Sequence, residues 1–210
     1  MNQEFLDKII TLIKENKGKR KFKQSVDLSV NFFHIDFSKQ DNRINIELNL
    51  KYPKGKEQPI IIFADDPNIA GIAKSMNIEV IQSSELQKVA TDKLMLNKLL
   101  KSFLLAQPSL MPQIAKSLGQ FLGSRNHMPK LIVGSDLNAI IKSAMNSVSL
   151  RTKGKNLPTI NCAIATETSP PEEIEANAEQ VIEALEKKVG KQNIKSVYIK
   201  LTMSKPVRLI

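Results

Sequence analysis

The sequence predicts a two-domain protein in which a doubly wound α/β domain is inserted into a split α+β sandwich built from both ends of the chain. In the terminal regions apolar residues alternate with polar ones, which is typical of strands with one buried face. In the middle, short strands that are apolar throughout alternate with helical segments, as in a parallel sheet with crossover helices. We therefore assign residues 1–56 and 149–210 to the α+β domain and residues 57–148 to the α/β domain.

The N-terminal region predicts one helix followed by two strands. Residues 2–16 place apolar side chains at helical spacing, and Gly18 provides a stop. Two segments within residues 24–50 then alternate apolar and polar side chains. We expect these segments to be antiparallel neighbours in one sheet.

The middle of the chain alternates strand and helix signals. The run from Ile60 to Ala64 is apolar without alternation, which predicts a strand covered on both faces. The expected strands are residues 60–64, 78–81, 103–106 and 131–133, and the expected helices lie near residues 68–76, 84–100, 108–122 and 136–146.

The C-terminal region returns to strand signals at residues 148–150 and 159–165. Residues 169–172, Ser-Pro-Pro-Glu, have the pattern of a capping box with a proline at the first helical position, and they predict the start of a helix. A closing strand is expected over residues 196–203.

The chain carries 31 Lys and Arg against 21 Asp and Glu, a formal net charge of +10 over 210 residues. This balance favours a polyanionic partner, because Lys and Arg side chains that neutralise phosphates release counterions. Nucleic acid and an anionic membrane surface both fit the charge alone. Two basic clusters, residues 19–23 and residues 151–155, are candidate phosphate contacts, although the first also fits a solvated turn.

We expect a cytosolic protein that does not cross a membrane. Cys162 is the single cysteine, so no internal disulfide can form. Glu4 and Asp7 lie where a signal peptide needs a basic start and an apolar stretch. The most apolar stretch, residues 99–122, is interrupted by lysines, glutamines and prolines, which argues against a transmembrane helix.

Residues that would carry catalysis are scarce. His34, His127 and Cys162 lack the spacings of metal or nucleophile motifs, so we predict no catalytic residue, no metal and no cofactor. The expected strand at residues 60–64 is followed by Asp-Asp-Pro-Asn and not by a glycine-rich phosphate loop. A nucleotide-using enzyme therefore remains only as an alternative.

Three motifs resemble the L-one family of large-subunit ribosomal proteins. Residues 103–130, FLLAQPSLMPQIAKSLGQFLGSRNHMPK, are similar to the family's F-L-A, L-M-P and L-G-x-x-L-G-P-R-x-x-M-P series. Residues 197–203, VYIKLTM, are similar to its closing strand, and residues 22–27, FKQSVD, to its F-x-x-[ST]-V-[DE] segment. The matches keep their order along essentially the whole chain, and the short archaeal-type or eukaryotic-type form is the nearer match.

The resemblance implies a split α+β domain with an inserted Rossmann-like domain, in agreement with the periodicity. It implies a structural, non-enzymatic constituent of the large ribosomal subunit that binds the stalk region of large-subunit rRNA near the tRNA exit site. It also implies repression of translation through binding to the chain's own mRNA, contact with exit-site tRNA, a cytoplasmic location on the ribosome and a monomeric state when free. A ribosome-associated or rRNA-processing factor of the same fold is the alternative.

Carried over by motif, the resemblance implies an RNA-binding site on the first and last strands of the split domain. Short hydroxyls and a carboxylate would contact ribose 2′-OH groups, methionine and phenylalanine would pack on sugars and bases, and lysines would neutralise phosphates. The expected RNA-binding residues are Lys21, Phe22, Ser25, Asp27, Lys153, Ser196, Thr202, Met203 and Ser204.

Two positions depart from the family's pattern. Ser204 and Lys205 stand where the family has Gly-Pro, so a turn that needs the positive φ of glycine would be altered. Ser124 stands where the family has a proline before Arg125, and the loop around Arg125 is expected to differ in shape.

Overall fold

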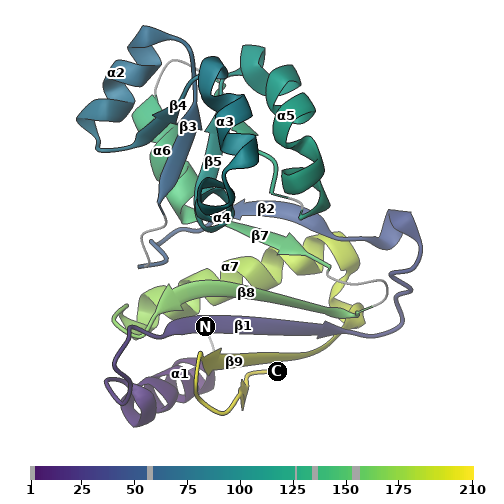
Figure 1. Cartoon of the computed structure of the whole chain (residues 1–210). Coiled ribbons are helices and arrows are strands. Elements are labelled where there is room, and N and C mark those ends of the chain that lie inside the picture. The colour runs from purple at the N-terminus through teal and green to yellow at the C-terminus, as the bar shows by residue number, and fades with distance from the viewer. Residues whose placement is uncertain (1–2, 56–58, 126, 134–136, 153–156) are drawn as a thin grey trace. The chain divides into compact units, whose positions relative to one another are not determined.

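The computed structural model describes residues 3–55, 59–125, 127–133, 137–152 and 157–210 (Figure 1). The chain divides into two compact units, which are described separately. The first unit comprises Met1–Lys56 and Asn146–Ile210, and the second comprises Glu57–Met145. The strand β7 (Ser147–Arg151) belongs to the first unit, and the expected boundary after residue 148 falls inside it.

The centre of the first unit is an antiparallel four-stranded sheet in the order β10-β9-β1-β8. Its strands are β1 (Ser25–Phe32), β8 (Thr159–Thr166), β9 (Ile194–Leu201) and β10 (Val207–Arg208). The helices α1 (Gln3–Asn16) and α7 (Pro171–Val189) contact this sheet and each other (Figure 1). Every second residue of β1 is buried in the core shared with these helices, so the polar residues between them lie on the opposite face of the sheet.

The strand β2 (Asn45–Asn49) does not pair with β1, so the expectation that the two are neighbours in one sheet is wrong. It pairs with β7 in a separate two-stranded antiparallel sheet, in which Ile46 lies opposite Leu150. The neighbours of β1 come from the C-terminal part of the chain, β8 on one side and β9 on the other. Alternation determines which side chains face the core, but it does not determine which strand lies alongside.

The helix α7 begins without the expected capping box. Pro170 occupies the N-cap position and Pro171 the first helical position, one residue later than predicted. The Ser169 hydroxyl lies 3.5 Å from the Thr166 amide and does not cap the helix. Glu172 therefore lies in the first helical turn, where its charge is favourable at the positive end of the helix dipole.

The second unit contains a parallel four-stranded sheet in the order β4-β3-β5-β6 (Figure 1). Its strands are β3 (Ile60–Phe63), β4 (Glu79–Ile81), β5 (Phe103–Ala106) and β6 (Lys130–Leu131). Its helices are α2 (Pro67–Ser75), α3 (Leu86–Thr91), α4 (Lys93–Lys101), α5 (Met111–Ser124) and α6 (Leu137–Asn146). Short 3-10 turns lie in the two units at η1 (Gln40–Asn42), η2 (Ser83–Glu85), η3 (Pro108–Leu110) and η4 (Lys191–Asn193).

The apolar run of β3 is explained by cover on both faces of the sheet. Ile61 and Phe63 belong to a core cluster that includes residues of α3, α4 and α5. Ile60 and Ile62 belong to a second cluster that includes residues of α2 and α6. Since both faces are buried, neither set of alternate positions can be polar.

The segment expected as one helix over residues 84–100 is two helices, so that expectation is wrong in detail. α3 ends before Asp92, whose backbone is extended. The Asp92 carboxylate accepts a hydrogen bond from the Leu94 amide at 2.8 Å and thereby caps α4. An aspartate that satisfies a free amide stabilises a new helix start more than it favours the middle of a helix.

Candidate nucleic-acid interface

The N-terminal end of β1 and the turn after β9 are joined through Ser25 and Thr202. The Ser25 amide donates to Thr202 Oγ1 at 3.1 Å, and the Thr202 amide donates to the Ser25 carbonyl at 3.1 Å. Thr202 Oγ1 in turn donates to the same carbonyl at 3.3 Å. The structure thus brings together two of the expected RNA-binding residues that are 177 positions apart in the chain.

Two large apolar side chains next to this junction in the chain are exposed. Phe22 is 50% exposed and Met203 is 56% exposed. Met203 also lines a hollow in the surface, together with Asn16, Lys19, Arg20 and Gln24. Side chains of this size are usually buried, so this pair offers apolar surface to a ligand.

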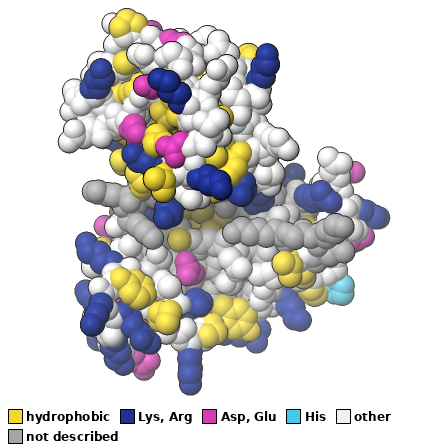
Figure 2. All heavy atoms as spheres, viewed as in Figure 1, with side chains coloured by type: hydrophobic (Ala, Val, Ile, Leu, Met, Phe, Trp, Pro, Cys, Tyr) yellow, Lys and Arg dark blue, Asp and Glu magenta, His cyan; other side chains and the backbone are white. Residues whose placement is uncertain are grey.

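The turn between α1 and β1 is strongly basic. Figure 2 shows Lys and Arg side chains gathered on this part of the first unit. The exposed cations of the turn are Lys17, Lys19, Arg20, Lys21 and Lys23. Lys21, the expected phosphate contact, is therefore one of several cations available for this role.

Asp27 lies on the polar face of the sheet, opposite Lys200 of β9 and Ala163 of β8. It is half-buried, as is Lys200. Sequence reasoning did not select Lys200 or Tyr198, which lies opposite Ser29 on the same face. The alternation of the closing strand could have identified them, because it places the side chains of Lys200 and Tyr198 on the face away from the core.

Ser196 lies apart from the other expected residues. It is opposite Asn31, six residues along β1 from Ser25, which corresponds to about 20 Å of strand. Ser196 is 5% exposed, and its hydroxyl accepts a hydrogen bond from Asn31 Nδ2 at 3.0 Å. Its position indicates a role in holding the sheet together at the end remote from Thr202.

Ser204 closes the turn after β9. Its hydroxyl accepts a hydrogen bond from the Leu201 amide at 2.8 Å and lies 3.0 Å from the Lys205 carbonyl. Positive φ among the described non-glycine residues is confined to His34 and Asn77, so Ser204 takes the family's glycine position without this strain.

The second basic cluster is described only in part. Lys153 lies outside the described residues. Arg151 is half-buried, and its Nε donates to Asn45 Oδ1 at 3.1 Å, across the pair β2 and β7.

Arg125 packs back on its own helix. Its guanidinium lies 4.1 Å from the centre of the Phe121 ring, and its Nη1 donates to the Phe121 carbonyl at 3.2 Å. Ser124 is the last residue of α5 and donates to the same carbonyl at 3.1 Å. The family's proline position is therefore part of the helix end in this chain.

The two histidines lie in different environments. His127 Nε2 lies 3.1 Å from the Leu99 carbonyl and 2.9 Å from the Ser102 carbonyl, so this nitrogen carries the donated proton. His34 is exposed at a positive φ of 57° beside the Phe33 ring. Within the described residues, no group of three or more His, Cys, Asp or Glu side chains could hold a metal ion.

Cys162 is an inert thiol. It is buried in the core of the first unit, and burial, together with the nearby Asp27 charge, raises its pKa to about 12. Because the thiolate is the reactive form, this cysteine is no nucleophile at neutral pH.

The acidic loop after β3 also has a structural explanation. Asp66 accepts a hydrogen bond from the Asn68 amide at 2.9 Å and caps α2, and Asp65 accepts one from the Ser83 amide at 2.8 Å. Gln107 Oε1 accepts from the Asp65 amide at 3.2 Å. These contacts occupy the carboxyl end of the sheet, where nucleotides bind in this class of fold.

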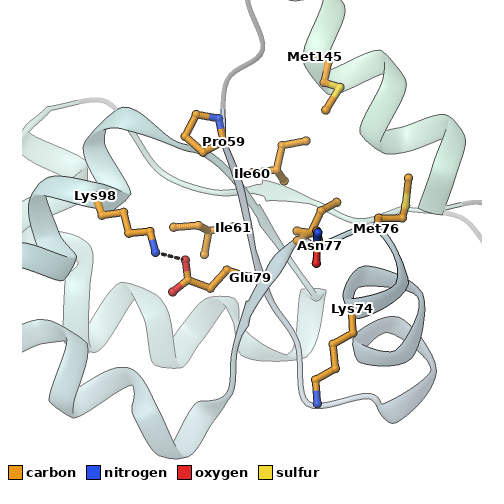
Figure 3. A pocket seen from close by; sticks show the side chains of 10 residues that line it. Pro59, Ile60, Ile61, Lys74, Met76, Asn77, Glu79, Lys98 and Met145 are labelled. Carbon is orange, nitrogen blue, oxygen red and sulfur yellow. Dashed lines mark ion pairs between the residues drawn. The ribbon is translucent and has the colours of Figure 1, made fainter.

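A pocket in the second unit lies at the amino ends of β3 and β4 (Figure 3). Its lining includes Pro59, Ile60 and Met145, and an ion pair of 2.6 Å joins Lys98 and Glu79. The described lining includes no Ser, Thr, Cys or His side chain, and its Lys98 is charge-paired with Glu79. Within the described part of the chain, no helix has the length and apolar character needed to cross a membrane.

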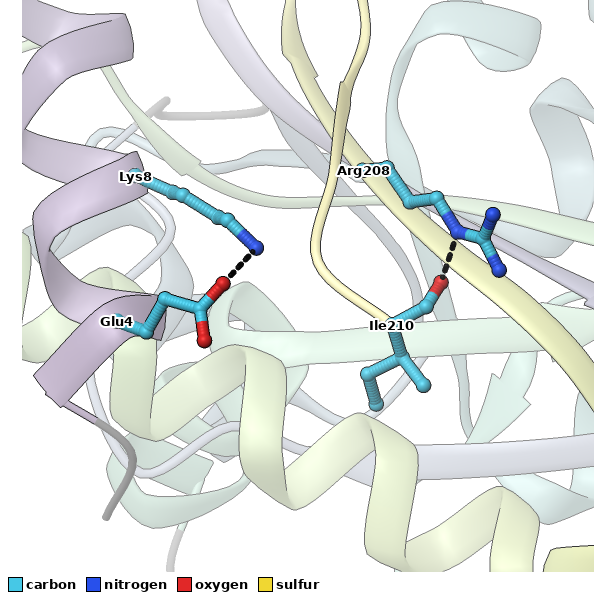
Figure 4. A network of polar contacts seen from close by, with 4 residues as sticks. All are labelled: Glu4, Lys8, Arg208 and Ile210. Carbon is cyan, nitrogen blue, oxygen red and sulfur yellow. Dashed lines mark hydrogen bonds and ion pairs between the residues drawn. The ribbon is translucent and has the colours of Figure 1, made fainter.

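A groove between α1, α7 and the C-terminal segment is acidic. Its carboxylates are Glu4, Glu179, Glu183 and Glu186. Figure 4 shows Glu4 paired with Lys8 at 2.7 Å and Arg208 Nε donating to the Ile210 carbonyl at 2.9 Å. These carboxylates repel phosphates, so the charge of this groove is unfavourable for binding nucleic acid.

Comparison with known proteins places this geometry in a family. Residues 12–205 match the Ribosomal protein L1p/L10e family. The chain belongs to this family. Its two-domain fold is accordingly that of the family, as the sequence motifs implied.

Relatives with the name Large ribosomal subunit protein uL1 match nearly the whole chain. The protein from Pyrococcus abyssi is 36% identical over 96% of this chain and 95% of its own. The protein from Thermofilum pendens is 37% identical over 91% and 86%, respectively. The protein from Thermoplasma acidophilum is 34% identical over 100% and 97%.

Proposed function

We propose that this chain is a non-enzymatic constituent of the large ribosomal subunit in the cytoplasm, and that it binds the stalk region of large-subunit rRNA near the tRNA exit site. The observation that carries the RNA-binding part is the junction of β1 and β9, where Phe22 and Met203 are about half exposed beside a basic turn. Membership of the ribosomal family supports the ribosomal part. We call the set Phe22, Ser25, Asp27, Thr202 and Met203 the junction surface.

The chemistry of the junction surface suits structured RNA. Exposed apolar side chains pack on sugar and base faces, and the lysines of the adjacent turn neutralise phosphates. The Ser25 hydroxyl has no hydrogen-bond partner among the described residues, so it is available to a ribose 2′-OH. Asp27 adds an acceptor for a 2′-OH, a group that DNA lacks.

The same surface supports the proposal that the chain represses its own translation. An mRNA segment that folds like the rRNA stalk would present the same riboses and phosphates, and the two RNAs would compete for one site. Contact with exit-site tRNA is part of the proposal because the rRNA stalk lies beside that site. We further propose that the free chain is a monomer.

Binding to a stalk-type rRNA fragment and to a DNA duplex of equal length, each titrated with salt, tests the proposal. We expect tight RNA binding with a strong preference over DNA. Met203→Ala is expected to weaken RNA binding by about tenfold, because it removes most of the apolar surface that this side chain would bury against the RNA. Met76→Ala is the matched control, since Met76 is 39% exposed in the second unit. Equal and steeply salt-dependent binding to both nucleic acids would reduce the site to a basic surface.

A further inference from the structure

The buried side chain of Gln24 makes three hydrogen bonds next to the junction surface. Its Oε1 accepts from the Met203 amide at 3.2 Å. Its Nε2 donates to Glu167 Oε2 at 3.0 Å and to the Asn16 carbonyl at 3.2 Å. Gln24 is 1% exposed and Glu167 is 6% exposed, so these bonds are sheltered from water.

These bonds join three segments that are distant in sequence. Asn16 is the last residue of α1, Glu167 follows β8, and Met203 lies in the turn after β9. The Glu167 amide also donates to the Gln24 carbonyl at 2.9 Å. Gln24 and Glu167 are therefore joined by one hydrogen bond between their main chains and one between their side chains. The carboxamide is thus the common contact of all three segments.

The hydrogen-bond partners of Gln24 allow its carboxamide only one orientation. The Asn16 carbonyl and the Glu167 carboxylate accept hydrogen bonds, so the NH2 group must face them. The Met203 amide only donates, so the oxygen must face Met203. Glu167 therefore contributes, together with Asn16 and Met203, to the direction in which Gln24 presents its oxygen to the turn.

We infer that Gln24 and Glu167 are positioning residues for RNA binding, which hold the Met203 backbone so that the exposed thioether points to the ligand. Neither side chain is accessible enough to contact RNA. They act through the amide of Met203, while Thr202 is held separately by Ser25. The inference rests on the proposed function of the junction surface.

The first test is a charge swap in the full chain. Gln24→Glu removes the donating NH2 group and sets two carboxylates against each other, and we expect RNA affinity to fall by about tenfold or more. The double variant Gln24→Glu with Glu167→Gln restores a donor facing an acceptor between the two side chains and leaves an acceptor for the Met203 amide, while the Asn16 carbonyl loses its donor. We expect it to recover most, but not all, of the RNA affinity that Gln24→Glu alone loses.

Gln192→Glu is the matched control. It makes the same chemical change at an exposed residue of η4, next to the end of the sheet remote from Thr202. The salt dependence of RNA binding should be unchanged in the swap, because the number of neutralised phosphates is unchanged. A Gln24→Glu variant that binds RNA as well as Gln192→Glu does would overturn the inference.

A double-mutant cycle separates positioning from general stability. If Gln24 acts through Met203, Gln24→Glu should cost much less RNA affinity in a Met203→Ala background than in the unsubstituted chain. Equal losses in both backgrounds would assign Gln24 a structural role alone. Should Gln24→Glu fail to fold, Glu167→Gln provides the milder variant for the same cycle.

Hydrogen exchange of the Met203 amide provides a readout that needs no RNA. We expect this amide to exchange faster in Glu167→Gln than in the unsubstituted chain, because a neutral acceptor in place of the Glu167 carboxylate holds the NH2 group of Gln24 less strongly. Faster exchange together with unchanged RNA affinity overturns the positioning role and leaves the proposed function intact. An unsubstituted chain that shows no RNA preference overturns both.

Discussion

The Thr202 hydroxyl illustrates how one residue supports both the fold and the junction surface. It accepts a hydrogen bond from the Ser25 amide and donates to the Ser25 carbonyl, so its proton is already used within the protein. Only its remaining lone pair is free for a ligand. A hydroxyl in this state contributes mainly by holding the ends of β1 and β9 together.

Thr202→Val is therefore expected to reduce stability as well as RNA affinity. The valine leaves the Ser25 amide without its side-chain acceptor, at a cost of about 1 kcal/mol in the free energy of unfolding. Thr202→Ser keeps the hydroxyl and should retain most of both properties. Thermal unfolding and RNA titration of the two variants check this, and a Thr202→Val protein of full stability would contradict it.

Glu175 gives stability a pH dependence. Its Oε1 has no hydrogen-bond partner among the described residues, and the side chain is 2% exposed. Burial raises the pKa of this carboxyl, and the nearby Glu179 raises it further. The folded state therefore binds the proton of this carboxyl more tightly than the unfolded chain does. Above the folded pKa the buried charge lowers the free energy of unfolding. This destabilisation disappears as the pH falls below the ordinary pKa of glutamate.

We expect Glu175→Gln to raise the melting temperature at pH 7 and to leave it unchanged below the ordinary pKa of glutamate. Melting temperatures of both proteins over a pH series measure this difference. Glu183→Gln, at an exposed residue of the same helix, is the control. A gain that is the same at every pH would show that packing, and not ionisation, is responsible.

At the scale of elements, periodicity predicts strands and helices but not their partners. The alternation of β2 correctly predicts a strand, yet its partner β7 lies about a hundred residues later in the chain, after the inserted second unit. The break at Asp92 follows from one hydrogen bond to the Leu94 amide, which competes with an otherwise continuous helical pattern.

The same limit applies to the candidate site. Motif resemblance selects Ser25 and Thr202, and the structure brings them into contact. It also selects Ser196, whose burial depends on Asn31 of the neighbouring strand. Motif resemblance does not select Gln24, because the role of its carboxamide depends on three hydrogen-bond partners from three separate segments. Contacts between distant segments are decided by tertiary packing and have no local sequence signal.

The basic turn between α1 and β1 is the element that should set the salt dependence. Lys21→Ala removes one exposed cation, so the slope of log affinity against log salt should become shallower by about 0.7–0.9 if Lys21 contacts one phosphate. The preference for RNA over DNA should persist, because phosphate contacts carry no sequence or sugar information. Lys191→Ala, an exposed lysine of η4, is the control, and an equal change in both variants would remove Lys21 from the interface.

At the scale of the molecule, every described residue of the junction surface belongs to the first unit. The basic turn belongs to it too, whereas the acidic groove on α1 and α7 gives that unit a second, phosphate-repelling surface. The hydrogen bonds that flank the insertion also lie within the first unit: the Leu50 amide donates to the Asn146 carbonyl at 3.1 Å, and the Tyr52 amide donates to Asn177 Oδ1 at 3.0 Å. Hydrogen bonds within the first unit therefore hold its two chain segments in place at the point where the second unit is inserted.

Replacing Glu57–Met145 by a short glycine linker is thus expected to leave a folded first unit that binds the stalk-type RNA. Because the residues that specify RNA are retained, its affinity should lie within about threefold of the full chain. A cooperative thermal transition establishes that the shortened chain is folded, and RNA titration then measures the contribution of the second unit. A folded first unit that loses its RNA preference would show that residues 57–145 supply specific contacts, and the site would have to be extended beyond the junction surface.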